Sequence, residues 1–291
     1  MATESTTKPQ LITTRDAAHE VITAVRSEGK TIGLVPTMGA LHAGHLSLVE
    51  AATAECDFTV VTVFVNPTQF GEGEDCNHYP RDLDRDLELL TEHAADLVFA
   101  PRTKEMYRAG HATRVVVGSV AKPLEGLCRP GHFEGVATIV LKLFNIIPAD
   151  FAYFGKKDYQ QCLVVQRMVE DLDLPIDIRI CPIVRDEDGL ALSSRNAYLS
   201  ADERRQALAL SKSLHLAESL IDSGERDAQE ITRKMRDLIQ SAGDVQIDYV
   251  EVADPETLEP VTVVNKTVVA LLAVRVGTAR LIDNALLRTP G

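Results

Sequence analysis

Two short apolar segments, residues 31–36 and 58–65, constrain the fold of this chain more than any other feature. Both are rich in β-branched residues, and neither alternates between polar and apolar positions. Such a pattern suits strands that are buried on both faces of a parallel sheet. Residues 96–100 and 151–154 are weaker strand candidates, and residues 176–181 alternate as an edge strand would.

Helical periodicity appears between these strands. Apolar residues recur at helical spacing in residues 46–56, 136–147 and 165–172. Strands that alternate with helices form βαβ units with right-handed crossovers. The sequence therefore predicts an α/β fold with a Rossmann-like, doubly wound parallel sheet, on which ligands lie beyond the carboxyl ends of the strands.

The pattern changes near Val184. A charged turn at residues 186–189 precedes two helical stretches, 201–221 and 227–240, and three short strands, 247–252, 268–274 and 278–282. Helices followed by strands indicate a separate α+β unit. We predict a Rossmann-like domain over residues 1–185 and a smaller C-terminal α+β domain over residues 186–291.

Composition excludes several classes of protein. The net charge of −13 argues against nucleic-acid binding, which needs clustered Lys and Arg. The longest apolar stretches, such as residues 268–274, are too short to span a membrane. Residues 1–10 lack the apolar core of a signal peptide and are expected to form a frayed tail, so a cytoplasmic location is the default expectation. The five cysteines form no Cys-x-x-Cys pair and are expected to be reduced thiols, mostly buried or half-buried.

The most informative motif is a Gly-punctuated turn, residues 36–44, between a buried strand and an amphipathic helix. It places His42 and His45 near a helix N-terminus, where we expect unbonded backbone N–H groups and the helix dipole to favour an anion. Gly44 would allow a ligand to approach the backbone closely. The alternative is an exposed loop with two polar residues.

Two further motifs carry groups suited to a polyphosphate. FGKKDYQQ, residues 154–161, offers Lys156 and Lys157 to phosphate and Asp158 to a ribose hydroxyl, or is a solvated loop with an Asp cap. LALSSRN, residues 190–196, offers two hydroxyls and a guanidinium, or is a hydroxyl-capped turn. Because the Walker motif G-x-x-x-x-G-K-[ST] is absent from the sequence, phosphate binding falls to these segments.

Polar residues also follow a strand in FVNPTQFG, residues 64–71, and fill the loop LEGLCRPGHFEGV, residues 124–136. Together with VPTMGALHAGH, YPRDLDRD, FGKKDYQQ, DGLALSSRN and RLIDN, in their order along the chain, they resemble the pantoate–β-alanine ligase family. The likeness extends from about residue 30 to residue 284, and HAGH matches the H-x-G-H signature of the nucleotidyltransferase superfamily.

The resemblance implies a two-step reaction. Pantoate attacks the α-phosphate of Mg-ATP to form pantoyl adenylate and pyrophosphate, and the amine of β-alanine then displaces AMP. It implies ATP contacts at Pro36, Thr37, Met38, His42, Gly44, His45, Gly155, Lys156, Lys157, Asp158, Val184, Leu192, Ser193, Ser194 and Arg195. Of these, it assigns catalytic roles to His42, His45, Lys157, Ser193, Ser194 and Arg195.

The same resemblance implies contacts to pantoate or β-alanine from Pro36, Met38, Phe64, Asn66, Gln69, Arg129 and Gln161. It places Asp86 near Mg²⁺ and implies a homodimer. Three positions depart from the family pattern: Lys156 replaces Glu or Gln, Arg85 replaces an acidic neighbour of the metal, and Leu192 replaces Met. Another H-x-G-H enzyme, such as a cytidylyltransferase, and an inert nucleotide-binding protein are the alternatives.

Overall fold

The structure is a computed structural model that describes residues 7–71, 73, 74, 76 and 78–289. The chain divides into two compact units. The first comprises Met1–Lys156 and Gln160–Pro182, and the second comprises Lys157–Tyr159 and Ile183–Gly291. The expected domain boundary after residue 185 falls close to Pro182. Each unit has a core of its own, and each is described by itself below.

The first unit contains a sheet of six parallel strands in the order β1-β4-β3-β2-β5-β6. The strands are β1 (Gln10–Ile12), β2 (Ile32–Thr37), β3 (Phe58–Val63), β4 (Leu97–Phe99), β5 (Phe151–Gly155) and β6 (Asp177–Cys181). The predicted doubly wound parallel sheet is confirmed, with β6 at an edge as expected. The strand order reverses between β2 and β5, and ligands of such sheets bind at this switch point.

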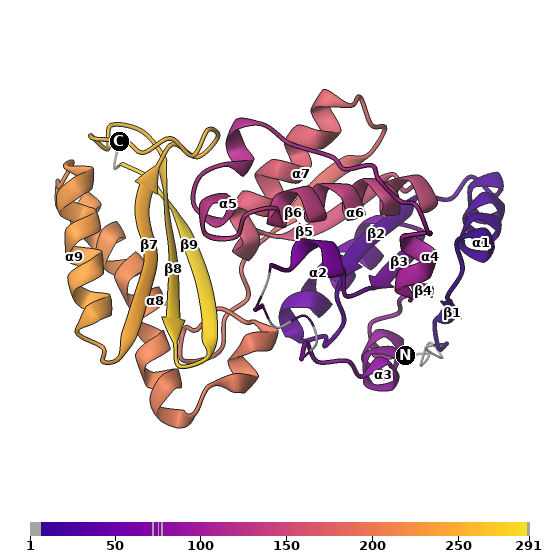
Figure 1. Ribbon diagram of the computed structural model, residues 1–291, viewed down its shortest axis with the longest axis horizontal. Helices are drawn as coiled ribbons and strands as arrows, with labels where there is room; N and C mark the ends of the chain where they lie inside the picture. Colours follow the sequence, from indigo (N-terminus) through magenta and orange to yellow (C-terminus); the bar gives the residue numbers. More distant parts are fainter. Residues whose placement is uncertain (1–6, 72, 75, 77, 290–291) are drawn as a thin grey trace. The chain divides into compact units, whose positions relative to one another are not determined.

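Helices cover both faces of this sheet (Figure 1). They are α1 (Arg15–Ser27), α2 (Ala43–Glu55), α3 (Leu83–Glu92), α4 (Thr103–Met106), α5 (Glu125–Cys128), α6 (His132–Ile146) and α7 (Tyr159–Asp171). Successive residues of β2 point to opposite faces: Leu34 packs into the core beneath α1, α6 and α7, whereas Val35 packs into the core beneath α2 and α3. Burial on both faces explains why β2 and β3 are mostly apolar and do not alternate between polar and apolar residues.

The second unit contains an antiparallel sheet in the order β7-β8-β9. Its strands are β7 (Val245–Ala253), β8 (Val268–Val276) and β9 (Ala279–Leu287), and two helices, α8 (Ala201–Asp222) and α9 (Ala228–Gln240), pack against it (Figure 1). Leu210 of α8, Ile231 of α9 and Leu272 of β8 are buried together. This is the smaller α+β unit that the sequence predicts.

The expectation that residues 1–10 form a tail is wrong at its end, because β1 begins at Gln10 and Leu11 pairs with Val98 of β4. A strand of three residues is too short to show periodicity in the sequence. α1 and α3 also lie outside the segments for which we predicted helices. None of the described helices is long and apolar enough to cross a membrane.

Candidate active site

The loop after β2 is held in an unusual backbone conformation. Gly39 and Ala40 have positive φ angles of 81° and 52°. Non-glycine residues adopt this region at a cost, so surrounding contacts must hold the loop. At its start, the Thr37 hydroxyl donates to the Thr62 carbonyl at 2.6 Å and accepts from the Gly39 amide at 3.2 Å. The loop ends at His42, which caps α2.

His42 and His45 lie together at the start of α2. Their ring centroids are 4.1 Å apart with an interplanar angle of 36°, and both side chains are half-buried. The Nδ1 atom of His42 accepts a hydrogen bond from the Gly44 amide at 3.1 Å. Because an accepting nitrogen carries no proton, the neutral His42 ring holds its proton on Nε2, which is then a donor.

The backbone amides here differ from our expectation. The Gly44 amide bonds to His42 Nδ1, and the amides of His45 and Leu46 bond to the His42 carbonyl at 2.8 and 3.1 Å. The prediction that these N–H groups are unbonded is therefore wrong. The cause is His42 itself, whose ring and carbonyl satisfy the first turn as a helix cap does. These three amides are therefore engaged by His42, and a contact from the imidazoles to an anion stays a prediction.

Gln69 is the last residue of the short helix η1 (Pro67–Gln69), which follows β3. Two residues outside η1 orient its side chain. Its Nε2 donates to Sδ of Met38 at 3.2 Å, and its Oε1 accepts from Nδ2 of Asn66 at 3.0 Å. Asn66 is 1% exposed, and its Oδ1 also accepts from the hydroxyl of Tyr107 at 2.7 Å. The structure thus brings three predicted substrate residues together. Asn66 orients Gln69, and its own contact to substrate stays a prediction.

The main chain of Gln69 is held by α6 and the loop before it. Because the Gln69 carbonyl can only accept, His132 donates to it through Nδ1 at 2.8 Å, so its Nε2 accepts from the Arg129 guanidinium at 3.1 Å. Burial, with Arg129 adding to it, lowers the pKa of His132 to about 4. The ring is therefore neutral near pH 7. The sequence shows His132 in a polar loop but gives no sign of this contact.

Gly135 allows α6 to approach η1 closely. A Cβ atom at residue 135 would lie 2.4 Å from the Thr68 carbonyl oxygen and 2.6 Å from the Gln69 amide nitrogen. The Gly135 carbonyl also accepts from Asn66 at 3.1 Å. Gly135 is therefore a supporting residue of the site that our prediction missed, because no local pattern marks a contact over this sequence separation.

Arg129, which we predicted to contact substrate, is engaged within the protein. Its guanidinium pairs with both carboxylate oxygens of Glu74 at 2.8 and 2.7 Å, and its side chain is 16% exposed. Such bidentate pairs fix the geometry of both partners. Arg129 thus bonds to Glu74 and to His132, the residue that holds the Gln69 carbonyl. Its contact to substrate stays a prediction.

The segment after β5 carries the predicted lysines. Gly155 ends β5, and a Cβ there would meet no atom of the described residues within 4 Å. Lys156 and Lys157 follow in the short helix η4 (Lys156–Asp158), which leads into α7 and Gln161. Gln161 is half-buried. Its neighbour Gln160, in contrast, is 3% exposed and donates to the carbonyls of Val120 and Pro123, so it is structural.

Within the second unit, the Lys157 carbonyl accepts from Nδ2 of Asn284 at 2.9 Å. The Lys157 ammonium lies 3.7 Å from the Asp158 carboxylate. Asn284 belongs to the RLIDN motif, to which the sequence assigned no contact. Its bond to the Lys157 main chain supplies a structural reason for an Asn at that position.

Two segments of the second unit that we predicted to contact ATP lie next to each other. The Leu192 amide donates to the Val184 carbonyl at 3.0 Å. Ser193 caps the short helix η5 (Ser194–Tyr198) by accepting from the Arg195 amide at 3.3 Å. The capping alternative is therefore correct for Ser193. Contacts of Ser193, Ser194 and Arg195 to phosphate stay predictions.

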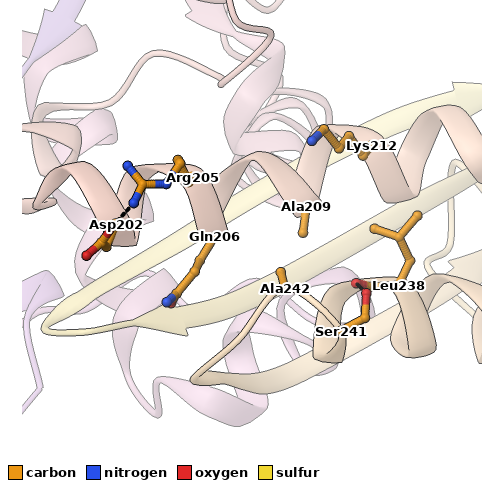
Figure 2. A pocket seen from close by; sticks show the side chains of 8 residues that line it. All are labelled: Asp202, Arg205, Gln206, Ala209, Lys212, Leu238, Ser241 and Ala242. Atoms are coloured by element: carbon orange, nitrogen blue, oxygen red, sulfur yellow. Dashed lines mark hydrogen bonds and ion pairs between the residues drawn. The ribbon is translucent and has the colours of Figure 1, made fainter.

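A groove of about 490 Å³ also lies in the second unit, between α8 and the end of α9 (Figure 2). It is lined by Asp202, Arg205, Gln206, Ala209, Lys212, Leu238, Ser241 and Ala242. Two of these residues, Asp202 and Arg205, form an ion pair. The groove contains none of the predicted site residues.

Six parallel strands in this order, with helices on both faces, define a doubly wound α/β protein, and its H-x-G-H turn lies at the start of the helix after β2. The sequence model of the family described as pantoate-beta-alanine ligase matches residues 10–286. The chain belongs to this family, as its motifs predicted.

Relatives with similar sequences align with this chain over nearly their whole length. The pantothenate synthetase of Aquifex aeolicus is 56% identical over 260 residues, 89% of this chain and 92% of the relative. That of Moorella thermoacetica is 52% identical over 278 residues, 96% of this chain and 98% of the relative.

Solved structures agree as well. The crystal structure of pantothenate synthetase from Thermus thermophilus matches with a TM-score of 0.90 at 45% identity, covering 95% of this chain and 98% of the other. Pantoate-beta-alanine ligase from Francisella tularensis, in complex with beta-gamma ATP and beta-alanine, matches with a TM-score of 0.80 at 34% identity, covering 96% and 97%.

Proposed function

We propose that this protein joins pantoate to β-alanine, consuming ATP and releasing pantothenate, AMP and pyrophosphate, through a pantoyl-adenylate intermediate. The observation that carries the proposal is the turn at α2. There, the imidazoles of His42 and His45 lie next to each other. Met38, in the loop that leads to His42, accepts a hydrogen bond from the side-chain amide of Gln69. Membership of the pantoate–β-alanine ligase family supports the same reaction.

The first step brings a carboxylate and a phosphate together, so the protein must position two anions and neutralise charge. The Nε2–H of His42 is a donor fixed in direction by the Gly44 contact, and His45 stands beside it. We assign both imidazoles to the departing pyrophosphate. Lys157 is assigned to the α-phosphate, where its ammonium offsets the charge that attack creates.

Pantoate carries a carboxylate, two hydroxyls and a branched apolar body. Gln69 and Gln161 offer neutral amide groups suited to the carboxylate and hydroxyls, and Pro36 and Phe64 offer apolar surface. Gln69 suits this task because its side chain and its main chain are both held, by Asn66 and by His132 respectively. A preorganised amide loses little conformational freedom when substrate binds.

The remaining ATP contacts are assigned by the family resemblance: Thr37, Gly44, Gly155, Lys156, Asp158, Val184, Leu192, Ser193, Ser194 and Arg195. Mg²⁺ is proposed to arrive with the triphosphate. Asp86 does not fit as its direct ligand, since the side chain is 1% exposed and each carboxylate oxygen accepts a backbone amide. A homodimer and a cytoplasmic location are also proposed on the resemblance alone.

The test is an assay for AMP. Purified protein is mixed with ATP, Mg²⁺, pantoate and β-alanine, and AMP, ADP and pantothenate are separated by chromatography. We expect AMP and pantothenate in equal amounts, and no AMP when pantoate is omitted. A requirement for CTP would favour a cytidylyltransferase, and ATP binding without turnover would favour an inert protein; either result contradicts the proposal.

Single substitutions test the assignments. His45→Ala and Lys157→Ala are each expected to lower kcat by about 10²-fold or more, because each removes a donor to transition-state charge. His215→Ala, at an exposed position on α8, is the matched control and is expected to keep full activity. Gln161→Ala should raise the KM for pantoate and leave the KM for ATP unchanged. Near-normal kcat in His45→Ala would refute the phosphate assignment.

A further inference from the structure

The Asp86 carboxylate lies against the strained loop that leads to His42. Asp86 is in the first turn of α3 and is 1% exposed. Its Oδ1 accepts from the Leu41 amide at 2.8 Å, and its Oδ2 accepts from the Ala40 amide at 3.1 Å. Both of its oxygens therefore bond to consecutive amides of a loop that lies 45 and 46 residues earlier in the chain.

The shape of the loop matches this carboxylate. A Cβ atom at Gly39 would lie 3.0 Å from Asp86 Oδ2 and 3.0 Å from Cγ1 of Val63, so a side chain there would push the carboxylate or Val63 away by a few tenths of an ångström. Ala40, next to it, has a φ of 52°, which costs a non-glycine residue about 1–2 kcal/mol. A conformation of this kind persists when its surroundings hold it. Asp86 supplies the hold, because it binds the amide of Ala40 itself.

The conformation of the loop matters for function because it sets the position of His42. Leu41 is buried and is bonded to Asp86, and the following residue is the cap of α2 whose ring accepts the Gly44 amide. A shift at residues 40 and 41 would therefore move the His42 ring and change the direction of its Nε2–H.

We propose that Asp86 is a positioning residue that acts through the loop at residues 39–41 on His42, and that it is not a ligand of Mg²⁺. This inference rests on the proposed function, since His42 matters only if the turn binds phosphate. Mg²⁺ demands near-ideal octahedral geometry, which a buried carboxylate already bonded to two amides does not offer.

The experiment measures the rate of AMP formation against Mg²⁺ concentration for the wild type, Asp86→Asn and Asp84→Asn. Asp84→Asn is the matched control, because it removes a charge from the same turn of α3 at an exposed position. In Asp86→Asn an amide NH₂ faces one of the two backbone N–H groups. We expect kcat to fall by about 10- to 100-fold, as for loss of a buried hydrogen bond to a charged group, with the half-saturating Mg²⁺ concentration unchanged.

A second readout follows His42 directly. The imidazole nitrogen shifts in the NMR spectrum of ¹⁵N-labelled protein should report the Nε2–H tautomer of His42 in the wild type and in Asp84→Asn. They should shift toward mixed tautomers in Asp86→Asn. If Asp86→Asn instead needs about ten times more Mg²⁺ and regains full rate at high Mg²⁺, as loss of a metal ligand would cause, the carboxylate binds the metal and the proposal is wrong.

Two further results keep the test decisive. If Asp86→Asn does not fold, Gly39→Ala examines the same contact from the loop side. It should lower kcat with the same unchanged Mg²⁺ dependence, and an altered Mg²⁺ dependence would overturn the proposal. An inactive wild-type protein would contradict the proposed function itself, whereas an active wild type with a fully active, folded Asp86→Asn would contradict only the role of Asp86.

Discussion

The close approach of α6 to η1 makes Gly135→Ala a direct test of the proposed substrate site. The added Cβ would lie 2.4 Å from the Thr68 carbonyl oxygen and 2.6 Å from Cα and N of Gln69. Ordinary van der Waals contacts at a Cβ are 3.4 Å or longer. The obstructing atoms are backbone, so they cannot rotate away, and α6 and η1 must separate by about 1 Å.

The expected change in unfolding free energy is the sum of two destabilising effects and one stabilising effect. Overpacking of this kind costs about 1–3 kcal/mol. Separation also lengthens the hydrogen bond from Asn66 to the Gly135 carbonyl, worth about 1 kcal/mol. Alanine regains about 1 kcal/mol over glycine inside a helix. We therefore expect the free energy of unfolding to fall by about 1–3 kcal/mol, leaving most of the protein folded.

Catalysis should suffer more than stability. The displaced residue is Gln69, and a misplacement of about 1 Å can cost on the order of 10²-fold in rate. Urea unfolding gives the stability, and steady-state kinetics give kcat/KM for pantoate, which should fall by about 10- to 100-fold with little change in the KM for ATP. Asn145→Ala is the control, because it changes an exposed residue of the same helix, α6. If Gly135→Ala matches the wild type in both measurements, the packing argument is refuted.

Three further predictions follow from buried groups. Because the pKa of His132 is lowered to about 4 from an unfolded value near 6.5, the unfolded chain binds more protons between these values. Stability should therefore be full above about pH 6.5 and fall by roughly 3 kcal/mol as the pH drops to 4. Urea titrations at several pH values give the unfolding free energy of the wild type and of His132→Gln. An equal dependence of this free energy on pH in the two proteins would contradict the prediction. Asp283→Ala, which leaves Arg185 of the same unit without its bidentate partner, should lower the unfolding free energy by about 3–5 kcal/mol, and a change below about 1 kcal/mol in urea would contradict it. Iodoacetamide should alkylate exposed Cys128 before Cys56, because burial raises the pKa of the Cys56 thiol, and mass spectrometry would reveal the opposite order if the reasoning fails.

The sequence predicts much of the fold because its central elements carry strong local patterns. β2 and β3 are mostly apolar segments rich in β-branched residues, and α6 repeats apolar residues at helical spacing over 15 residues. β1 escaped prediction because it has three residues, of which Leu11 is 42% exposed. Its strand conformation comes from pairing with β4, a contact that no local pattern can reveal.

The candidate site shows the same difference between features with a local sequence pattern and features that depend on distant contacts. The sequence identifies His42 and Gln69 as candidate site residues because each lies in a short, ordered string of residue types. The contacts that support them escaped prediction, because Asp86 binds Leu41 across 45 residues and His132 binds the Gln69 carbonyl across 63 residues. Hydrogen bonds from a side chain to a distant main-chain group leave no spacing pattern in one sequence.

The supports also explain why a polar residue in a loop need not contact substrate. A polar side chain in a Gly-rich or Pro-rich loop suggests a ligand, but a buried turn also has carbonyls and amides that must be satisfied. Asp86 satisfies two amides and His132 satisfies one carbonyl, and Arg129 orients that histidine while pairing with Glu74. Each of these side chains directs its hydrogen bonds to the protein. The Gly44 amide donates to Nδ1 of His42, so the ring orientation and the direction of its Nε2–H are fixed by the fold. This fixed direction supports the proposal that His42 donates to phosphate.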